Sequence, residues 1–575
     1  MRNKLLRYSV ALMAALMLTA ACGIWEPEPE IPMEPTFPAT PAPVPEPDTT
    51  ESATRDFVPP PAGDWMAPYG QTVLITAASM YDENRPFEDG DDLSNNPWTR
   101  LYKDALNIEV EFDWIYDDDY ELRLKMAIAT GNLPDVFYIP EDADPQIFIE
   151  LHEAGMLLDL TDAYNEYTSG RIREHELTDP YIIERYTIDG RIFGVPRYHS
   201  GQIGQPRFMW VRKDWYEDAG SPAIRTVEDL EELARLFRRE YGASYGIAVN
   251  SDLEWLFGTA PMFGAYVGNI NNEEYFWMPD ETGRLRPGIS FPEFRTALEY
   301  WRKWYRERII GADFKNLDSD GLALEDVIGG KVGIQCFGQD WGSWASDIVS
   351  LQGDNAYFVP MNLPTLEGDS PARAQIYYQN TGVIVASASF NNPAALMKIL
   401  SINDHMLFDP DAGLSDEDYN YYIDDGREYS MTPTFRMIDP GADLRQFQHV
   451  LHALETQDTS GLFTSGMKAM YGDALSWMSY KDPGGLGAYL LTGFDGSAAG
   501  RSNHLLSSDL IVMNSMWGPA PPELGDAGSP GGIVMEGLIH IITGRRNIND
   551  WPAILEKWYE QGGQTMEDAV NAHYG

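Results

Sequence analysis

The chain has 575 residues, which is too many for one hydrophobic core, because domains usually close at about 100–250 residues. Acidic residues outnumber basic residues by 89 to 41, and the net charge of −48 opposes binding to nucleic acids and to anionic lipid headgroups. Apolar residues make up 43% and aromatic residues 12% of the chain, enough for packed cores with aromatic side chains to spare. We therefore expect at least two globular lobes and no nucleic-acid partner.

The N-terminus has the layout of a bacterial signal peptide. Arg2, Lys4 and Arg7 precede an apolar run that ends in small residues, and this run is short for a stable membrane span. The sequence LTAAC at 18–22 resembles a lipobox, in which the cysteine is lipidated after cleavage. We predict a lipoprotein signal peptide at 1–21, lipidation at Cys22, and attachment to the extracellular face of the cell membrane by the lipid alone.

The residues after Cys22 refine this prediction. Gly23 stands where an aspartate would retain a lipoprotein in the inner membrane of a two-membrane bacterium, so a Gram-positive-type cell is favoured. Residues 22–65 consist mainly of Pro, Glu, Thr and Ala, and such a segment buries too little apolar surface to fold. We expect a disordered tether that holds the rest of the chain away from the membrane.

Strand and helix patterns alternate after the tether. Apolar runs predict strands at 71–79, 107–115 and 136–139, and helical periodicity predicts helices at 95–106 and 120–130. Asn95 or Asn96 suits the start of the first helix, and Gly131 suits the end of the second. This alternation predicts an α/β lobe with a mainly parallel sheet.

A second alternating series begins near residue 189. Strands are predicted at 207–211, 245–249, 331–337 and 381–389, and helices at 226–241 and 392–404. Cys336 lies in one of the apolar strands, where a cysteine is expected to be a small buried hydrophobic residue. Two such series in one chain imply two lobes.

Residues 280–308 predict a hairpin followed by a helix. Gly283 suits the turn, and Ser290 with Glu293 fits the S-x-x-E pattern of a capping box. Four large apolar residues then recur at helical spacing and should form one core-facing stripe. They are Phe294, Leu298, Trp301 and Tyr305.

Three motif matches are weak in their context. GASYG at 242–246 fits a nucleophile elbow, but Ser244 follows a helix and precedes a strand, the reverse of what the elbow requires. His449, His452 and Glu455 are spaced along a helix, yet helix-face histidines are more often structural than metal-binding. The acidic stretch 409–420 lacks the glycine and the glutamate of a calcium loop. We predict no catalytic residue, no metal site and no cofactor, with a structural calcium ion left open.

Several segments resemble those of the extracellular solute-binding proteins of bacterial ABC importers, in particular the large lipoprotein branch associated with oligosaccharides. Together these segments span almost the whole chain after the tether. They are WTRLYKDALNIEVEFDW, MAIATGNLPDVFYIP, IDGRIFGVPRY, DETGRLRPGISFPEFRTALEYWRKWY, NTGVIVASASFNNPAALMKIL and INDWPAILEKWYEQGGQTMEDAVNAHYG.

The resemblance implies an α/β fold of the periplasmic-binding-protein type, with two lobes joined by a multi-segment hinge and a ligand cleft between them. It implies a first lobe at 66–190 plus about 384–465, and a second lobe at 191–383 plus about 466–575. The implied function is the capture of an oligosaccharide or other carbohydrate by a non-enzymatic monomer that closes around it. The ligand is then delivered to permease subunits driven by a separate ATPase, since the chain has no GxxxxGK[ST] motif of its own.

Sheets of this type bind ligands beyond the carboxyl ends of their strands, so residues that follow the predicted strands are candidate ligand-binding residues. A sugar needs flat aromatic walls and planar hydrogen-bonding groups. The candidates that follow strands are Tyr81, Glu83, Asn84, Asp142, Arg197, Tyr198, Gln339, Asp340, Trp341 and Trp344. Further candidates are Tyr378 and Asn380, just before the strand at 381–389, and Trp517 in a loop-rich C-terminal stretch. The resemblance implies that Trp341 and Trp344 stack on sugar; the alternative is that one of the two packs beneath the hinge.

Two other functions stay open. A surface glycoside hydrolase or esterase would need a positioned acid and base or an activated nucleophile, and no such set is recognisable in so acidic a chain. A peptide receptor of the same fold is compatible with the abundance of aromatic residues.

Overall fold

The chain separates into two units, Met1–Arg55 and Asp56–Gly575, and all described residues belong to the second unit. In the computed structural model they are 63–79, 90–115, 120–140, 146–178, 183–197, 206–317, 321–376, 382–409, 412, 435–437, 441–516, 521, 524 and 530–575. The predicted signal peptide, Cys22, nearly all of the predicted tether and most of the acidic stretch 409–420 lie outside the described residues. Within the described ranges, no helix is long and apolar enough to cross a membrane.

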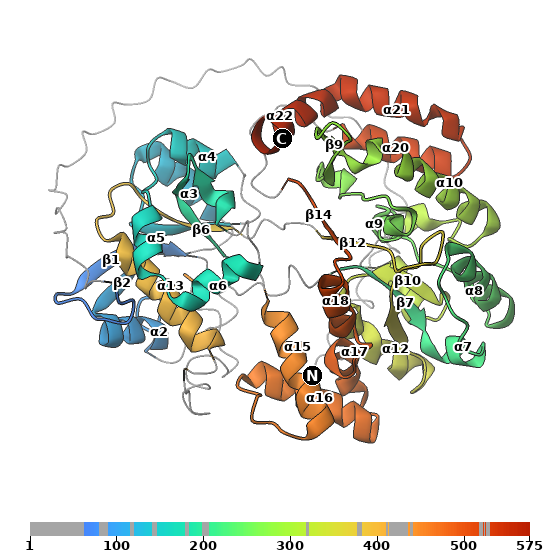
Figure 1. Ribbon diagram of the computed structural model, residues 1–575, viewed down its shortest axis with the longest axis horizontal. Coiled ribbons are helices and arrows are strands. Elements are labelled where there is room, and N and C mark those ends of the chain that lie inside the picture. The colour runs from blue at the N-terminus through green and yellow to red at the C-terminus, as the bar shows by residue number, and fades with distance from the viewer. Residues whose placement is uncertain are drawn as a thin grey trace, which may run out of the picture. The chain divides into compact units, whose positions relative to one another are not determined.

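Five strands form the sheet of the first lobe (Figure 1). They are β1 (Val73–Ser79), β2 (Ile108–Ile115), β3 (Val136–Ile139), β6 (Gly194–Pro196) and β13 (Val383–Ala386), in the order β2-β1-β3-β13-β6. β1 pairs in parallel with β2 and β3, whereas β13 pairs antiparallel with β3 and β6. All of these strands except β13 therefore run in one direction, which confirms the mainly parallel sheet.

Both faces of this sheet are buried. Phe137 and Ile139 of β3 point into one hydrophobic cluster, and Val136 and Tyr138 point into another. Successive side chains of a strand alternate between the two faces, so a strand that is covered on both sides carries an unbroken apolar run. This is why 136–139 could be recognised as a buried strand from its sequence.

Helices cover the two faces: α2, α5 and α13 contribute to one cluster, and α3 and α4 contribute to the other. The helices of this lobe are α2 (Pro97–Leu101) with a π-helical continuation at Tyr102–Leu106, α3 (Tyr120–Thr130), α4 (Gln146–Glu153), α5 (Thr161–Tyr167), α6 (Gly170–Thr178) and α13 (Pro393–Phe408). A 3-10 turn at Glu184–Tyr186 leads into the hairpin strands β4 (Thr187–Ile188) and β5 (Arg191–Ile192). The Asn96 side chain caps α2, and Gly131 follows α3 with a φ of 68°, as predicted.

The second lobe contains an antiparallel sheet in the order β10-β7-β11. β7 (Phe208–Arg212) lies between β10 (Ile334–Phe337) and β11 (Phe358–Met361). Cys336 on β10 is free and fully buried, as predicted. The predicted strand 245–249 forms only isolated bridges, through Ile247 to Ile310 and to Ile334, so it does not extend the ladder.

The remaining elements surround this sheet or extend from it. The helices are α7 (Lys213–Asp218), α8 (Val227–Glu240), α9 (Glu254–Phe257), α10 (Pro292–Glu307), α11 (Leu322–Ile328), α12 (Ala345–Gln352), α15 (Ala442–Thr456), α16 (Ser465–Tyr480), α17 (Leu486–Thr492), α18 (Ala498–Ser507), α20 (Gly531–Ile542), α21 (Trp551–Trp558) and α22 (Gln564–Tyr574). Short turns are η3 (Ala260–Phe263), η4 (Ile270–Asn272), η5 (Gly288–Ser290), η6 (Phe314–Asn316), η7 (Gln339–Trp344), η10 (Pro483–Gly485), η11 (Ile548–Asp550) and η12 (Tyr559–Gly563). β8 (Trp277–Pro279) pairs with β9 (Leu285–Pro287), and β12 (Ala374–Ile376) pairs in parallel with β14 (Ile511–Met513).

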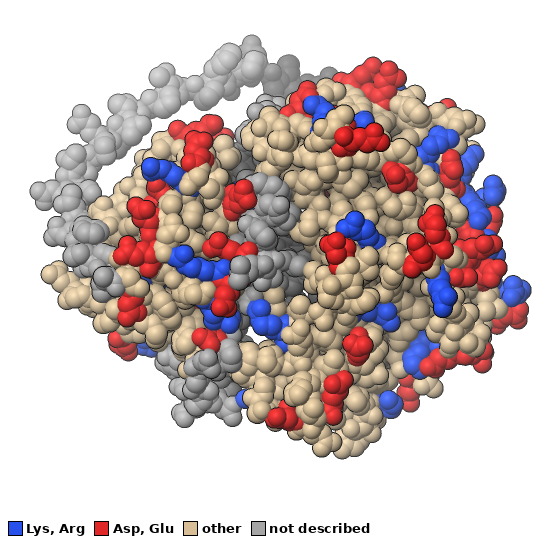
Figure 2. Space-filling view, in the orientation of Figure 1, with Lys and Arg blue, Asp and Glu red and all other residues tan. Residues whose placement is uncertain are grey.

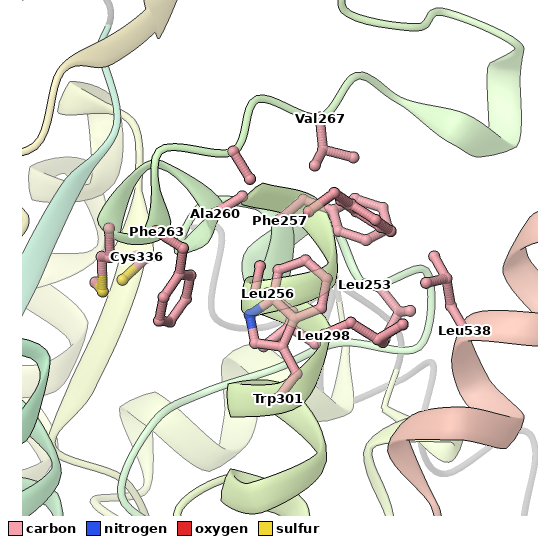
Figure 3. Close-up of a cluster of buried hydrophobic side chains, with 14 of the residues drawn as sticks. Leu253, Leu256, Phe257, Ala260, Phe263, Val267, Leu298, Trp301, Cys336 and Leu538 are labelled. Carbon is pink, nitrogen blue, oxygen red and sulfur yellow. The ribbon is translucent and has the colours of Figure 1, made fainter. Parts of the chain in front are cut away.

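The predicted apolar stripe of α10 faces the core of the second lobe. Phe294, Leu298 and Trp301 are fully buried, and Tyr305 packs at the margin of the same cluster. Figure 3 shows Trp301 among side chains from the segment 253–267, and its Nε1 donates a hydrogen bond to the hydroxyl of Thr259 at 2.9 Å. The stripe is therefore a packing surface, as predicted.

The predicted capping box at the start of α10 is wrong. The N-cap residue is Phe291, and no side chain caps it. Ser290 belongs to the preceding turn η5, and its hydroxyl donates instead to the carbonyl oxygen of Pro287 at 2.7 Å. Pro292 at the first helical position needs no partner for a backbone N–H, which lessens the need for a cap.

Two of the proposed lobe limits differ from the packing of the described elements. β6, which the limit at 190 assigned to the second lobe, pairs with β13 in the sheet of the first lobe. α15, assigned to the first lobe, shares a hydrophobic cluster with α16 through Val450, Ala453 and Met467. The division of the whole chain into two lobes with those limits stays a prediction, with β6 moved to the first lobe and α15 to the second.

Candidate functional site

The strand ends of the first sheet meet at one edge. Ile139 at the end of β3 pairs with Val383 at the start of β13, and Val383 also pairs with Pro196 at the end of β6. Ser79 and Ile115, the last residues of β1 and β2, pair with each other next to β3. The segments that carry the predicted ligand-binding residues of this lobe therefore all begin or end at the same edge of the sheet.

Most of those predicted residues lie outside the described ranges, as does Trp517 of the second lobe, and their roles stay predictions. They are Tyr81, Glu83, Asn84, Asp142, Tyr198, Tyr378 and Asn380.

Arg197 is the predicted residue that the structure describes at this edge. Its backbone N–H donates to the carbonyl oxygen of Gly382 at 3.2 Å, and its guanidinium carbon lies 5.4 Å from the ring centroid of the buried Tyr138. Burial and, to a smaller extent, the charge of Arg197 lower the pKa of Arg436 to about 10. The edge thus holds a guanidinium group over an aromatic ring, a combination suited to planar polar ligands.

The strand ends of the second sheet also share one edge. Cys336 of β10 and Met361 of β11 both pair with Met209 of β7, so β10 and β11 end on either side of the start of β7. β10 continues into η7, which contains the predicted residues Gln339 and Asp340; their side chains are outside the described part of the structure. This is the edge at which ligand-binding loops are expected.

The two tryptophans of η7 have different environments. Trp341 is 3% exposed, and its ring lies 5.9–6.4 Å from the rings of Trp255, Phe337 and Phe358. Trp344 is 41% exposed. Trp341 therefore packs as a core residue, the alternative considered from the sequence, whereas the Trp344 ring has free surface on which a ligand can stack.

The loop that follows the segment 245–249 contributes charged residues that the sequence analysis did not select. An Nη2 atom of Arg207 lies 2.5 Å from a carboxylate oxygen of Glu254, and Nη1 donates to the Glu254 carbonyl oxygen at 3.0 Å. Burial raises the pKa of Asp252, and the charge of Glu254 raises it further. The rule that picks residues after strands would have found Asp252 and Glu254 if it had been applied to this strand as well.

Buried polar groups lie on and next to β10. The side-chain amide of Gln335, the Nδ2 atom of Asn250 and the indole nitrogen of Trp255 have no hydrogen-bond partner among the described residues. The Asn250 side-chain oxygen accepts from the backbone N–H of Trp255 at 3.0 Å, which holds the two residues together. Such groups are costly to bury without a partner, and these three residues are at most 2% exposed.

Neither the nucleophile-elbow match at Ser244 nor the histidine pair His449 and His452 forms a site in the described residues. Ser244 lies in the turn after α8, where its backbone N–H donates to the carbonyl oxygen of Lys331 at 2.8 Å. His449 and His452 lie on α15, and burial lowers the pKa of His449. Within the described ranges no group of three or more His, Cys, Asp and Glu residues is placed to hold a metal ion.

The acidic residues are dispersed over the surface. Figure 2 shows Asp and Glu side chains interspersed with Lys and Arg across one face of the molecule. Several form exposed pairs, such as Lys103 with Glu109 at 2.6 Å and Lys125 with Glu121 at 2.6 Å. Exposed pairs of this kind contribute little to stability, so the charge mainly keeps the surface solvated.

The sequence has recognisable relatives in Bacillus subtilis. It is 24% identical to Lipoprotein LipO over 314 residues, which cover 52% of this chain and 58% of the relative. It is also 24% identical to the polygalacturonan/rhamnogalacturonan-binding protein YtcQ over 234 residues, which cover 40% of this chain and 44% of the relative. The chain thus spans about half the length of the curated relatives that it matches.

Solved structures share the fold. The HMO binding ABC-transporter associated solute binding protein from Bifidobacterium longum infantis aligns with a TM-score of 0.55 at 13% identity, covering 88% of this chain and 98% of that one. The alginate-binding protein AlgQ2 without calcium ion aligns with a TM-score of 0.51 at 12% identity, covering 88% and 99%. This agreement confirms the predicted periplasmic-binding-protein-like α/β fold.

Residues 88–397, more than half of the chain, match the family described as bacterial extracellular solute-binding protein. That match includes the sheet of the first lobe from β2 onward, the central sheet of the second lobe and the loop 250–254. The chain belongs to the bacterial extracellular solute-binding protein family.

Proposed function

We propose that this protein is the substrate-binding component of a bacterial ABC importer and that its ligand is an oligosaccharide. The observation that carries the proposal is the chemistry at the carboxyl edges of the two sheets. Arg197 and Tyr138 lie at the first edge, and Arg207, Glu254 and Trp344 lie at or beside the second. Planar charged groups form paired hydrogen bonds with sugar hydroxyls, and aromatic rings cover the apolar faces of sugar rings.

The named relatives support a carbohydrate over a peptide. YtcQ is named for polygalacturonan and rhamnogalacturonan, the Bifidobacterium protein for HMO, and AlgQ2 for alginate. Because the family consists of substrate-binding proteins, we propose that the chain binds its ligand without chemical conversion. The predicted residues in the segments outside the described ranges would complete the site from the first sheet edge.

Closure of the two lobes on the ligand is the proposed signal to the transporter. A permease can distinguish loaded from empty protein only if the two states differ in structure, so the ligand must favour one arrangement of the lobes. The partners in this proposal are the permease subunits and a separate ATPase, and the protein acts as a monomer. No cofactor is required.

Titration calorimetry of the purified full chain against a panel of neutral and acidic oligosaccharides tests the ligand class. We expect saturable binding to at least one glycan, with a smaller radius of gyration in solution scattering when it is bound. Trp344→Ala should weaken binding about tenfold or more, because stacking on an aromatic ring contributes strongly to affinity. Absence of binding to every glycan would refute the carbohydrate proposal, and shortening of a glycan by the pure protein would favour the hydrolase instead.

Lipid anchoring through Cys22 is the second part of the proposal. It rests on the lipobox-like LTAAC sequence and on the similarity to Lipoprotein LipO. Cys22→Ser should release the protein from the membrane fraction into the medium, whereas Cys336→Ala should leave it anchored because that thiol is buried in β10. Full membrane retention of the Cys22→Ser protein would refute the anchor.

A further inference from the structure

A pocket of about 450 Å³ lies beside the carboxyl end of β11, and we call it the Arg501 pocket. It is formed by α7, the segment before α8, the segment 361–371 and α18. Its lining includes Tyr216, Arg225, Met361, Asn362, Asp369 and Arg501. A pocket of this size is large enough to hold a small ligand.

Arg501 is the half-buried cation of this pocket. Its Nε donates to the carbonyl oxygen of Gly496 at 2.9 Å, and its Nη1 lies 3.5 Å from the side-chain oxygen of Asn362. No carboxylate among the described residues lies within ion-pair distance of it, and burial lowers its pKa despite the charge of Asp495. Most of its guanidinium donors therefore have no strong acceptor within the described structure.

The other charged groups of the pocket favour an anion. Arg225 contributes a second, exposed guanidinium and forms no ion pair with a described carboxylate. Asp369 is the opposing carboxylate, and it is exposed to solvent, where its repulsion of an anion is screened. A half-buried guanidinium without an ion-pair partner gains most from a ligand that presents two oxygens in one plane, as a carboxylate does.

The place of the pocket in the fold connects it to the proposed ligand edge. Met361 ends β11 at the same level as Cys336 on β10, because both residues pair with Met209. The pocket therefore begins at the edge of the second sheet from which η7 and Trp344 also extend. An extended ligand bound along this edge would reach it.

We propose that the Arg501 pocket binds the carboxylate of a uronic acid unit, which makes acidic oligosaccharides the ligand class of this protein. This inference rests on the proposed oligosaccharide-binding function and narrows it. Met361 and the other apolar wall residues contact the C–H face of the sugar, and Asn362 and Tyr216 are placed to bind its hydroxyls. Long-range repulsion from the −48 charge slows the approach of such a ligand, so the affinity arises from local contacts.

The test compares oligogalacturonate with the same oligomer after methyl esterification, which removes the charge but keeps the sugar chain. Calorimetry of the purified full chain should give at least about tenfold tighter binding of the acid than of the ester, because charge-assisted hydrogen bonds are the stronger kind. Arg501→Gln should weaken binding of the acid by at least about tenfold and binding of the ester by a much smaller factor, so that this preference is lost. Arg501→Lys, which keeps the charge but not the planar pair of donors, should retain part of it.

Two further variants make the test specific. Arg225→Gln should weaken acid binding by a smaller factor, because this arginine is exposed at the rim. Arg239→Gln is the matched control, since Arg239 is exposed on α8 and pairs with the adjacent Glu240 at 2.7 Å. It should bind both oligomers as the unmodified chain does, and thermal unfolding confirms that each variant is folded.

The outcomes separate this inference from the function on which it rests. Equal binding of acid and ester, an equal loss of both in folded Arg501→Gln, or binding of only neutral glycans overturns the uronate pocket and leaves the oligosaccharide proposal standing. Absence of binding to every glycan overturns both proposals.

Discussion

Gly382 lies so close to Tyr138 that a Cβ atom at position 382 would be 2.2 Å from the phenolic oxygen. The φ of Gly382 is +67°, a conformation that other residues adopt only with strain. We predict that Gly382→Ala lowers the free energy of unfolding by about 3 kcal/mol, through strain and overpacking. The substitution should also weaken ligand binding, because it displaces the Tyr138 ring, over which the guanidinium of Arg197 lies. Urea unfolding and calorimetry measure the two effects.

Gly190→Ala provides the control for this prediction. Gly190 has a similar φ of +74°, but no atom lies within 4 Å of the position of its Cβ. It should therefore lose only about 1 kcal/mol, the cost of the left-handed backbone conformation for an alanine. If Gly382→Ala and Gly190→Ala lower the free energy of unfolding equally, the close contact between position 382 and Tyr138 does not affect stability.

Alanine variants of Trp341 and Trp344 should have different effects: the first should lower stability, and the second should weaken binding. Trp341→Ala is expected to lower the free energy of unfolding by about 3–5 kcal/mol, because it opens a cavity in a buried aromatic cluster. Trp344→Ala should change stability by less than about 1 kcal/mol, because the ring is 41% exposed, while it weakens binding. The opposite pattern in denaturant titrations and calorimetry would assign the stacking role to Trp341.

Asp252 should make the protein less stable as the pH rises. Burial raises the pKa of this carboxyl in the folded state, so folding favours its protonated form. The penalty is absent below the unfolded-state pKa of about 3.9 and is fully present above the raised folded-state value. Asp252→Asn should therefore stabilise the protein at pH 7 relative to pH 4, and it should weaken ligand binding if Asp252 contacts the ligand. Urea unfolding at both pH values measures the difference.

Asp280→Asn is the control with the opposite sign. Hydrogen bonds from Thr282 lower the pKa of Asp280, so its ionised form stabilises the fold above the unfolded-state pKa. Its replacement should reduce stability at pH 7 and have less effect near pH 3. A gain of stability at pH 7 in this variant would contradict the hydrogen-bond explanation.

Glu231 joins α8 to α10. Its buried carboxylate accepts hydrogen bonds from Lys303 at 2.6 Å and from the indole nitrogen of Trp304 at 2.8 Å. Glu231→Gln removes the negative charge that pairs with the partly exposed Lys303 and weakens the hydrogen bond from Trp304, so we expect a loss of about 2 kcal/mol in the free energy of unfolding. Glu228→Gln on the exposed face of the same helix should change stability by less than about 0.5 kcal/mol. If Glu231→Gln and Glu228→Gln change the stability equally in thermal unfolding, the contacts of Glu231 do not stabilise the fold.

The buried strands were the part of the fold most accessible to sequence reasoning. Residues 136–139 and 383–386 are covered on both sides, so their composition alone identifies them. The segment 245–249 is also apolar but pairs only through Ile247, because ladder formation depends on partners distant in the sequence. The capping box at Ser290 failed for a different, local reason: the turn before α10 offers the Ser290 hydroxyl a competing acceptor, the carbonyl oxygen of Pro287.

The sequence allowed the location of the candidate site, at the edge of a sheet, to be predicted. It was a poorer guide to which side chains form the site. The position of Arg197 after β6 followed from the rule about strand ends. The different burial of Trp341 and Trp344 could not be predicted from that rule. The two residues lie three apart in one helical turn, and only the aromatic rings packed around Trp341 make it the buried one. The pairing of Arg207 with Glu254 joins residues 47 apart in the sequence and needed coordinates to be found.

β13 lies between β3 and β6 in the first sheet, although Val383 at its start comes 244 positions after the end of β3 at Ile139 and 187 positions after the end of β6 at Pro196. A chain that emerges from a ribosome or an export channel with its N-terminus first cannot complete this sheet until residue 386 has appeared. Until then β3 and β6 each lack a neighbour, so the first lobe to be synthesised is among the last to be finished. Such distant pairing slows folding and keeps the chain open for longer while it is being threaded across a membrane.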